Sequence, residues 1–436
     1  MEKVSEKITS EVRISLAIFT ITQKIKNVSL FKERIEEFLD KSITELLEII
    51  LGGGISAETS DIHIEPEKQG VKIRVRIDGV LHDVVTFDFK TYQALLARIK
   101  LLSGIKLNIA DRPQDGRFSV LIEKVPIEIR VSTLPAEYGE SVVMRILNPK
   151  SLIDLEVLGL REDLLATLKK EIVRPNGMII VTGPTGCGKT TTLYAFLKEI
   201  QGPEIKIITI EDPIEYHLKG ISQTQVAPKK GYDFTSGLKS IMRQDPDVIL
   251  VGEIRDLETA EIALQAALTG HLVFTTLHTN DAAGTVARLI ALGSKPANIG
   301  PAINIAIAQR LVRKSCKKCL KLEKPNPEEL EKIKRNLREI SKKIRITKVQ
   351  KELKIPKAQG CKYCNFTGYR GRVGIYEVMI IDAEMEKFIL ENPSIAALRE
   401  KAIEKGMVTV QQDGILKVLA GETTIEEVER IAGKIK

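Results

Sequence analysis

One stretch of the chain, Met178–Leu193, restricts the fold more than any other. It opens with a short apolar run of the kind seen in a central parallel strand, and this run ends at Gly183. The pattern G-x-x-x-x-G-K-T follows, which is typical of a loop that holds phosphate between a strand and a helix. Glycine reaches backbone angles closed to other residues, so bare amide groups can approach an anion. The sequence therefore predicts an α/β domain that binds a nucleoside triphosphate.

The segment 183–191, called the phosphate loop below, supplies the expected nucleotide contacts. Its residues are Gly183, Pro184, Thr185, Gly186, Cys187, Gly188, Lys189, Thr190 and Thr191. We expect Lys189 to reach the β- and γ-phosphates and the Thr190 hydroxyl to ligate Mg²⁺. The following helix would add its positive N-terminal end. Cys187 is expected to be a small loop residue and not a nucleophile, because no histidine stands beside it to lower its pKa.

Length and composition narrow the class of protein. A chain of 436 residues is long enough for two or three domains. The net charge of +8 permits a nucleic-acid partner but does not require one, and aromatic residues are only 4% with no Trp, which leaves little for base stacking. No apolar run approaches the roughly 18 residues of a membrane span. Because no signal peptide is recognisable, we expect a cytoplasmic protein with reduced thiols.

The first third of the chain changes from helical to strand-rich patterns. Residues 1–50 carry apolar residues at helical spacing, and the glycine run within 51–55 predicts a break. Residues 51–150 alternate in the manner of an α+β domain, with Asp78-Gly79 as a hairpin turn. The expected strands are 62–64, 71–77, 80–85, 117–122, 125–131 and 141–147, with a helix over 90–104.

Residues 151–436 form the predicted nucleotide-binding domain, in which strands and helices alternate from 161 to about 310. Such alternation calls for a mostly parallel sheet. Ligands of these sheets gather at the carboxyl ends of the strands. Beside the phosphate-loop strand, the expected strands are 206–210, 248–251 and 272–277.

Polar residues directly after these strands are the candidate catalytic groups. Glu253 is expected to activate water, and Glu211 with Asp212 could bind Mg²⁺ through water. His278 could sense or polarise the γ-phosphate. The alternatives are that the acids only cap helices and that His278 is a core histidine.

Four of the five cysteines form two C-x-x-C pairs, which predicts a metal site. The candidate ligands are Cys316, Cys319, Cys361 and Cys364. Four thiolates in two close pairs suit tetrahedral Zn²⁺, and in a reducing compartment this is favoured over disulfides or two separate redox pairs. With no open coordination position, the zinc would be structural. The expected module spans 311–380, and helices follow over 381–436 as a small C-terminal bundle.

Four motifs between residues 183 and 278 resemble those of one family. They are Gly183-Pro-Thr-Gly-Cys-Gly-Lys-Thr-Thr-Thr192, Ile210-Glu-Asp-Pro-Ile-Glu-Tyr216, the run 242–256 and the run 269–278. They resemble the Walker A, Asp, Walker B and His boxes of the type II secretion and type IV pilus assembly ATPases. The resemblance continues in Ser60–Pro66, Gln114–Arg117, Ile129–Thr133 and Gly374–Glu377. It covers roughly residues 51–436.

The resemblance implies a fold and a set of partners. It implies a RecA-like P-loop domain preceded by a smaller, PAS-like α+β domain, assembled as a homo-hexamer that hydrolyses ATP. Arginines of the first domain would reach the phosphates: Arg117 and Arg130 fall in matching segments, with Arg76 and Arg145 as weaker candidates. Partners would be the inner-membrane platform and docking proteins, so that the protein is held peripherally at the inner membrane. The four-cysteine module resembles that of assembly-type members.

The expected function is an ATP-driven motor for assembly of a pilus or a secretion pseudopilus. The cofactors would be ATP, Mg²⁺ and Zn²⁺. A nucleic-acid translocase or helicase on the same RecA-like core is the alternative, which the basic charge favours slightly and the scarce aromatic residues disfavour. A scaffold that does not hydrolyse ATP is a third alternative, against which the intact Lys189, Thr190 and Glu253 argue.

Overall fold

The structure is a computed structural model that describes residues 11–123, 125–149, 153–340 and 353–435. The chain forms two compact units. The first comprises Met1–Ser151 together with Cys316–Cys319 and Gln359–Arg370, and the second comprises Leu152–Ser315, Leu320–Ala358 and Gly371–Lys436. Two short segments from the second half of the chain thus belong with the N-terminal unit.

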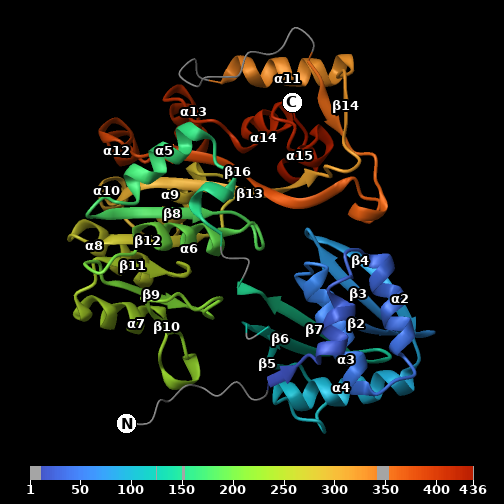
Figure 1. The fold of residues 1–436 in the computed structure, drawn as a ribbon. Coiled ribbons are helices and arrows are strands. Elements are labelled where there is room, and N and C mark those ends of the chain that lie inside the picture. The colour runs from blue at the N-terminus through green and yellow to red at the C-terminus, as the bar shows by residue number, and fades with distance from the viewer. Residues whose placement is uncertain (1–10, 124, 150–152, 341–352, 436) are drawn as a thin grey trace. The chain divides into compact units, whose positions relative to one another are not determined.

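The first unit is a seven-stranded sheet with helices (Figure 1). Its strand order is β1-β5-β6-β7-β2-β3-β4. The strands are β1 (Glu11–Arg13), β2 (Asp61–Glu67), β3 (Gly70–Ile77), β4 (Val80–Phe87), β5 (Gln114–Ile122), β6 (Val125–Ala136) and β7 (Gly139–Leu147). The helices are α1 (Leu16–Thr22), α2 (Val28–Phe38), α3 (Ile43–Ser56) and α4 (Phe89–Ser103). Each predicted strand and the predicted helix of 51–150 is present.

The tight turn between β3 and β4 confirms the hairpin prediction. Ile77 pairs with Val80, so the connection has two residues. Asp78 and Gly79 both have positive φ, 49° and 82°, as a hairpin turn with the twist of the flanking strands requires.

The predicted helix break at 51–55 is wrong, because α3 continues through all three glycines. The glycines serve close packing. A Cβ at Gly53 would lie 2.5 Å from the Phe31 ring, and one at Gly54 would lie 2.7 Å from Ile62. Burial of the neighbouring helix and sheet against this bare face offsets the poor intrinsic helix propensity of glycine. The glycine run therefore marks a helix interface.

The second unit is a three-layered α/β fold around another seven-stranded sheet (Figure 1). Its strand order is β10-β9-β11-β12-β8-β13-β16. The strands are β8 (Gly177–Thr182), β9 (Ile207–Glu211), β10 (Ser222–Gln225), β11 (Val248–Val251), β12 (Leu272–Leu277), β13 (Ile303–Ser315) and β16 (Tyr369–Ile380), beside a small pair, β14 (Lys321–Glu323) and β15 (Ile355–Lys357). The strands β8 to β13 of the large sheet pair in parallel, as predicted.

Helices cover both faces of this sheet. The helices of the unit are α5 (Glu162–Glu171), α6 (Lys189–Ile200), α7 (Phe234–Ile241), α8 (Leu257–Leu268), α9 (Ala283–Leu292), α10 (Pro296–Ala302), α11 (Pro327–Glu339), α12 (Ala383–Leu390), α13 (Ile395–Glu404), α14 (Val410–Leu419) and α15 (Ile425–Ala432). Of these, α11, α14 and α15 pack with β15 in a separate small core. Alternate residues of β8 enter two separate cores: Met178 and Ile180 pack with α8 and α9, whereas Ile179 and Val181 pack with α6. This two-sided burial explains why the strand is continuously apolar.

The compact units divide the chain differently from the predicted domains. Residues 11–50 belong to the same unit as 51–149, and β1 pairs with β5 inside its sheet. The cysteine segments also cluster with this unit, although we assigned them to the ATPase domain. Residues 1–10 of the predicted helical segment and 341–352 of the predicted insert lie outside the described residues. Among the helices that the structure describes, none is long and apolar enough to cross a membrane.

Candidate nucleotide site and metal centre

The phosphate loop leaves β8 and enters α6 with glycines at the positions that need them. Gly183, Gly186 and Gly188 have φ values of 147°, 78° and 90°. A Cβ on Gly183 would lie 2.6 Å from the Gln309 carbonyl oxygen, so no side chain fits there. The helix α6 begins at Lys189, and its N-cap residue, Gly188, provides no side-chain cap. Its first amide groups therefore remain open to an anion.

Lys189 lies where the motif predicts. Its Nζ donates to the carbonyl oxygens of Gly183, at 2.8 Å, and Pro184, at 3.3 Å. Burial lowers the pKa of Lys189, and the negative charge of Glu253 acts against this shift. The loop thus keeps a half-buried cation facing its own carbonyls, where it can exchange these contacts for phosphate oxygens.

Cys187 is buried inside the loop. Burial raises the pKa of its thiol. A thiol with a raised pKa is a poor nucleophile, which agrees with the expectation that Cys187 only fills space.

Hydrogen bonds between strand ends gather the site at one edge of the sheet. Thr182 Oγ1 donates to the Leu277 carbonyl at 2.9 Å, which joins the ends of β8 and β12. Thr276 Oγ1 donates to the Gly252 carbonyl at 2.8 Å, which joins the ends of β12 and β11. The residues that follow these strands are therefore held together.

Glu253 and His278 meet at this edge. His278 Nε2 lies 3.4 Å from Glu253 Oε2, and Arg255 Nη2 lies 2.5 Å from Glu253 Oε1. The Glu253 side chain is 17% exposed, so water can reach it while its orientation is fixed. Because Glu253 also acts electrostatically on Lys189, three of the predicted groups share one site.

Glu211 is placed differently from the other candidate acids. It is 3% exposed and accepts hydrogen bonds from Thr209 Oγ1 at 2.6 Å, Gln223 Nε2 at 3.2 Å and the Tyr194 hydroxyl. Burial raises the pKa of Glu211, and these hydrogen bonds lower it. The carboxyl ties β9 to α6 and β10. Its role in binding Mg²⁺ stays a prediction.

Asp212, the residue directly after β9, acts electrostatically on Arg255, the partner of Glu253. Its charge raises the pKa of Arg255, after the larger effect of the Glu253 hydrogen bond. The adjacent Glu211 and Asp212 thus interact with different groups: Glu211 accepts hydrogen bonds from neighbouring side chains, and Asp212 acts on Arg255. The residue types alone do not reveal this difference.

The four candidate arginines of the first unit lie in one row across five strands. Arg117 of β5 pairs with Arg130 of β6, and Arg130 pairs in turn with Arg145 of β7. Asp61 of β2 pairs with both Arg145 and Arg76. Paired residues on neighbouring strands share a face of the sheet, so the four guanidinium groups form a basic ridge.

One acid lies in this ridge. Arg145 Nε donates to Asp61 Oδ1 at 3.0 Å, and Arg76 Nε lies 3.6 Å from Asp61 Oδ2. Arg130 Nε also pairs with Glu128 Oε1 at 3.1 Å, within its own strand. Sequence analysis named the arginines but missed the ridge, because the register of five strands is not visible in any one segment. The alternation of Arg74 and Arg76 along β3 was the available signal.

The four cysteines of the C-x-x-C pairs come together as predicted. Their Sγ atoms all lie within 4.8 Å of one another. Cys316 and Cys361 are 4.0 Å apart, and Cys364 lies 3.8 Å from both Cys319 and Cys361. Tetrahedral zinc with Zn–S bonds of about 2.3 Å needs S···S separations of about 3.8 Å, so the donor set fits a four-thiolate metal site.

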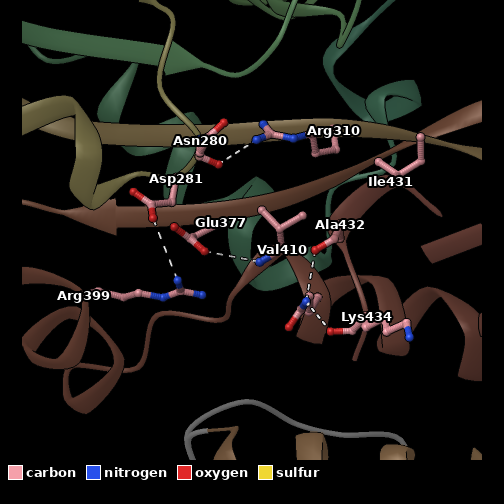
Figure 2. A pocket seen from close by; sticks show the side chains of 10 residues that line it. Asn280, Asp281, Arg310, Glu377, Arg399, Val410, Ile431, Ala432 and Lys434 are labelled. Carbon is pink, nitrogen blue, oxygen red and sulfur yellow. Dashed lines mark hydrogen bonds and ion pairs between the residues drawn. The ribbon is translucent and has the colours of Figure 1, made fainter. Parts of the chain in front are cut away.

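A cavity of about 510 Å³ lies in the second unit, between the loop after β12 and the C-terminal helices (Figure 2). Arg310 Nη2 donates to the Asn280 carbonyl at 2.7 Å. Glu377 accepts from the amide of Ala282 at 2.9 Å. It also accepts from the amide of Val410 at 3.3 Å (Figure 2). Burial raises the pKa of Glu377. These contacts join β13 and β16 to the segment that follows His278. Sequence analysis singled out neither Arg310 nor its neighbour Gln309.

Comparisons with known proteins agree with this site. The profile of the family described as "Type II/IV secretion system protein" matches residues 36–430. The type II secretion system ATPase E of Vibrio cholerae is 44% identical over 395 residues, covering 90% of this chain and 76% of that protein. The type IV pilus assembly ATPase PilB of Thermus thermophilus is 43% identical over 374 residues, covering 85% of this chain and 41% of that protein.

Solved structures show the same fold. The pilus retraction motor PilT with bound ADP has a TM-score of 0.57 at 27% identity, covering 87% of this chain and 95% of that one. The ATPase DotB of Legionella pneumophila has a TM-score of 0.63 at 23% identity, covering 88% and 94%. The predicted fold class is confirmed. The chain therefore belongs to the type II/IV secretion system protein family and is an ATPase.

Proposed function

We propose that this ATPase acts as a hexameric motor that powers assembly of a type IV pilus or of a type II secretion pseudopilus. Two similar proteins support this: one is named for type II secretion and the other for pilus assembly. The observation that carries the proposal is the meeting of Glu253 and His278 at the sheet edge that bears the phosphate loop.

Each group at this edge has a role that its surroundings support. The open amides of the phosphate loop and Lys189 bind the phosphates of ATP, and the Thr190 hydroxyl helps to hold Mg²⁺. Glu253 orients the attacking water, because its carboxylate is fixed by Arg255 and still reachable by solvent. His278, beside Glu253, responds to the γ-phosphate. ATP and Mg²⁺ are thus the proposed cofactors of the second unit.

The basic ridge supports a role for the first unit in hydrolysis. Arg117 and Arg130 are directly opposite each other, and the same register brings Arg145 and Arg76 into the ridge. The ridge gathers positive charge on one face of the sheet, and this charge attracts anions such as phosphate groups. Arginine suits the phosphates of ATP because its guanidinium offers a planar set of donors and a permanent charge. We therefore propose Arg117 and Arg130 as the arginines that stabilise charge in the transition state.

Zinc is the proposed metal of the four-cysteine cluster. Four thiolates without an open position favour a structural zinc site over a catalytic one. We also propose that the protein works in the cytoplasm, held at the inner membrane by the platform and docking proteins of its machine. A nucleic-acid translocase is not favoured, because the similar proteins named above serve secretion and pili.

Glu253→Gln tests the hydrolytic role. The variant keeps the size of the side chain and removes its charge, so it should bind ATP but hydrolyse it about a hundredfold or more slower. Mass photometry with ATP should find hexamers of the variant. Wild-type turnover would remove Glu253 from catalysis, and monomers at saturating ATP would contradict the ring. ATPase activity that DNA stimulates with a steep salt dependence would favour the translocase.

Arg117→Gln tests the ridge against a structural role. Removing the Arg117 charge should lower ATPase activity about tenfold to a thousandfold, because the charge of the transition state is then less well offset. The stability of the first unit is measured on the same variant. Exposed Arg13→Gln in the same unit is the control and should behave as wild type. A loss of stability with unchanged turnover would make Arg117 a structural residue.

A further inference from the structure

The phosphate loop packs against Gln309, a residue that none of the four sequence motifs contains. Gln309 lies on β13, the neighbour of β8, and is 1% exposed. Its Oε1 accepts a hydrogen bond from Thr192 Oγ1 at 2.7 Å. A Cβ on Gly188 would lie 2.9 Å from Gln309 Nε2, so the amide packs directly on the glycine that begins α6. One side chain thus contacts both the last loop glycine and the first turn of the helix.

Thr192 also joins α6 to β16. The Thr192 side chain lies beside the hydroxyl of Tyr376, a residue of the Gly374–Glu377 motif, and acts on the pKa of that phenol. The Tyr376 hydroxyl donates to the Leu158 carbonyl at 3.0 Å. Burial and the charge of Asp413 raise the pKa of Tyr376, so the phenol stays a neutral hydrogen-bonding group. Thr192 and Tyr376 are each 1% exposed.

The far end of this chain of contacts is fixed. The Tyr376 amide donates to Asp413 Oδ2 at 2.8 Å, and Arg161 Nη1 donates to Asp413 Oδ1 at 2.6 Å. Asp413 is 1% exposed and its partner Arg161 is largely buried. A buried carboxylate with an arginine and an amide as partners holds its neighbours in one arrangement. The strand that carries Tyr376 is therefore a firm support.

We propose that Gln309, Thr192 and Tyr376 are positioning residues for ATP hydrolysis, which together hold the first turn of α6 and the phosphate loop in the binding geometry. We call the three residues the loop brace. The inference rests on the proposed function, since it assumes that this loop binds the phosphates. Its physical basis is that the loop must place Gly188, Lys189 and Thr190 within fractions of an ångström of the phosphates. A misplacement of about 1 Å can cost about a hundredfold in rate.

The brace also explains why these polar groups are buried at all. A buried hydroxyl or amide without a hydrogen-bond partner costs about 1–3 kcal/mol of folding free energy. Apolar residues would make a purely structural contact without this possible cost. Hydrogen bonds instead specify direction, which apolar packing does not. The hydrogen-bonding side chains of the loop brace can therefore fix the orientation of the phosphate loop.

A double-mutant cycle between Gln309 and Thr192 tests the brace. Gln309→Leu removes the amide at similar volume, and Thr192→Val removes only the hydroxyl. Each should lower kcat/KM for ATP about tenfold to a hundredfold, and the double variant should be no worse than the poorer single variant, because both lose the same bond. Losses that multiply, or Gln309→Leu with wild-type kcat/KM, would overturn the brace.

Conservative changes separate positioning from simple stability. Thr192→Ser keeps the hydroxyl and should recover most of the kcat/KM that Thr192→Val loses. Tyr376→Phe removes one hydroxyl and should cost about twofold to tenfold in kcat. All variants are assayed well below their own Tm. A structural role would lower Tm and leave kcat and KM unchanged. Should Gln309→Leu fail to fold, the Val and Ser variants of Thr192 decide the question by the same comparison.

Two further measurements complete the test. In the nucleotide-free protein, loss of the brace should speed hydrogen exchange at the amides of 188–193 and leave the amides of α8 unchanged. Lys189→Ala is assayed in parallel. If Lys189→Ala is inactive while the Gln309 and Thr192 variants are normal, only the brace is wrong. If Lys189→Ala hydrolyses ATP at the wild-type rate, the proposed nucleotide site itself is wrong.

Discussion

The phosphate loop and the four-cysteine cluster are two sites of one chain that are built in opposite ways. The loop is a single segment between β8 and α6, and its glycines, lysine and threonine stand within nine consecutive positions, 183–191. The cluster joins two segments separated by 320–360, and both segments belong to the N-terminal unit. A local motif carries its own geometry, whereas the cluster needs distant parts of the chain to be folded first.

The cluster is also attached to the N-terminal helices. Asn365 Oδ1 accepts a hydrogen bond from the amide of Val28, the first residue of α2, at 2.8 Å. Arg370 Nη2 donates to Glu58 Oε2 at 3.0 Å, near the end of α3. A metal that fixes the cysteine segments would therefore also order the surface on which α2 begins. The comparison predicts that damage at either site leaves the chemistry of the other intact.

Lys189→Ala should have the largest effect. Without the ammonium group, the charge on the transferring phosphoryl group is not offset, and ATP hydrolysis should fall by roughly a thousandfold or more. Steady-state phosphate release measures the loss, and metal analysis of the same sample should match wild type. Lys219→Ala, an exposed lysine of the same unit, is the control. Undiminished turnover would remove the loop from catalysis, and loss of metal would break the separation of the two sites.

Cys316→Ser should abolish tight metal binding. Wild type should carry one metal ion per chain, and loss of one of four thiolates should weaken binding by more than the roughly hundredfold seen for outer-shell partners. Metal analysis after dialysis against a chelator gives the stoichiometry. Cys187→Ser, which changes the cysteine outside the cluster, should keep the metal. A full metal content in Cys316→Ser, or none in wild type, would contradict the assignment.

The part of the fold that the sequence predicted well is the part with local causes. Apolar runs marked β11 and β12 at their observed bounds, and β8 and β9 to within a residue. These strands are buried on both faces, so their composition alone identifies them. The phosphate loop was equally clear, because its glycine positions follow from its own backbone.

What the sequence did not reveal depends on distant neighbours. The glycine run of α3 looked like a breaker because its partners, Phe31 and Ile62, lie outside the window in which propensity is judged. The different surroundings of Glu211 and Asp212 could not be foreseen either, because the partners of Glu211 come from α6 and β10 and Asp212 acts on Arg255. Likewise, Gln309 reaches the phosphate loop only because β13 pairs with β8.

Glu211→Gln should have a moderate effect that changes with pH. Losing matched hydrogen bonds should cost about 1–2 kcal/mol of unfolding free energy. Because burial holds the pKa of Glu211 above that of an unfolded glutamate, the folded state binds more protons. Wild-type stability should therefore fall as pH rises from the ordinary glutamate pKa to the raised value, and the variant should lack this component.

Urea unfolding followed by circular dichroism measures this difference, since the chain has no Trp to report by fluorescence. The stability of wild type minus that of Glu211→Gln should shrink as pH rises above 4.5. Glu204→Gln, an exposed glutamate of the same unit, should follow wild type at every pH. A difference that is constant with pH would mean that Glu211 is not held in its protonated form. Unchanged activity would count against its role in binding Mg²⁺.

Asn365→Gly should have the smallest effect and gives the sharpest test of the link between cluster and helix. Asn365 has a φ of 53°, which glycine tolerates, so the variant removes the side chain without strain. The Val28 amide is one of the helix-end donors without a partner in its own helix, and losing its acceptor should cost about 1 kcal/mol, or roughly fivefold faster hydrogen exchange.

Asn365→Asp keeps an acceptor oxygen at the same place and should retain slow exchange at Val28. Asn365 directly follows Cys364, one of the four cysteines of the cluster. Removing the metal from wild type with a chelator should therefore speed hydrogen exchange at the same amide. The phosphate loop amides should be unaffected, since they belong to the other unit. If hydrogen exchange at Val28 is equal in the Gly and Asp variants, or does not change when the chelator removes the metal, the four-cysteine cluster does not stabilise the start of α2.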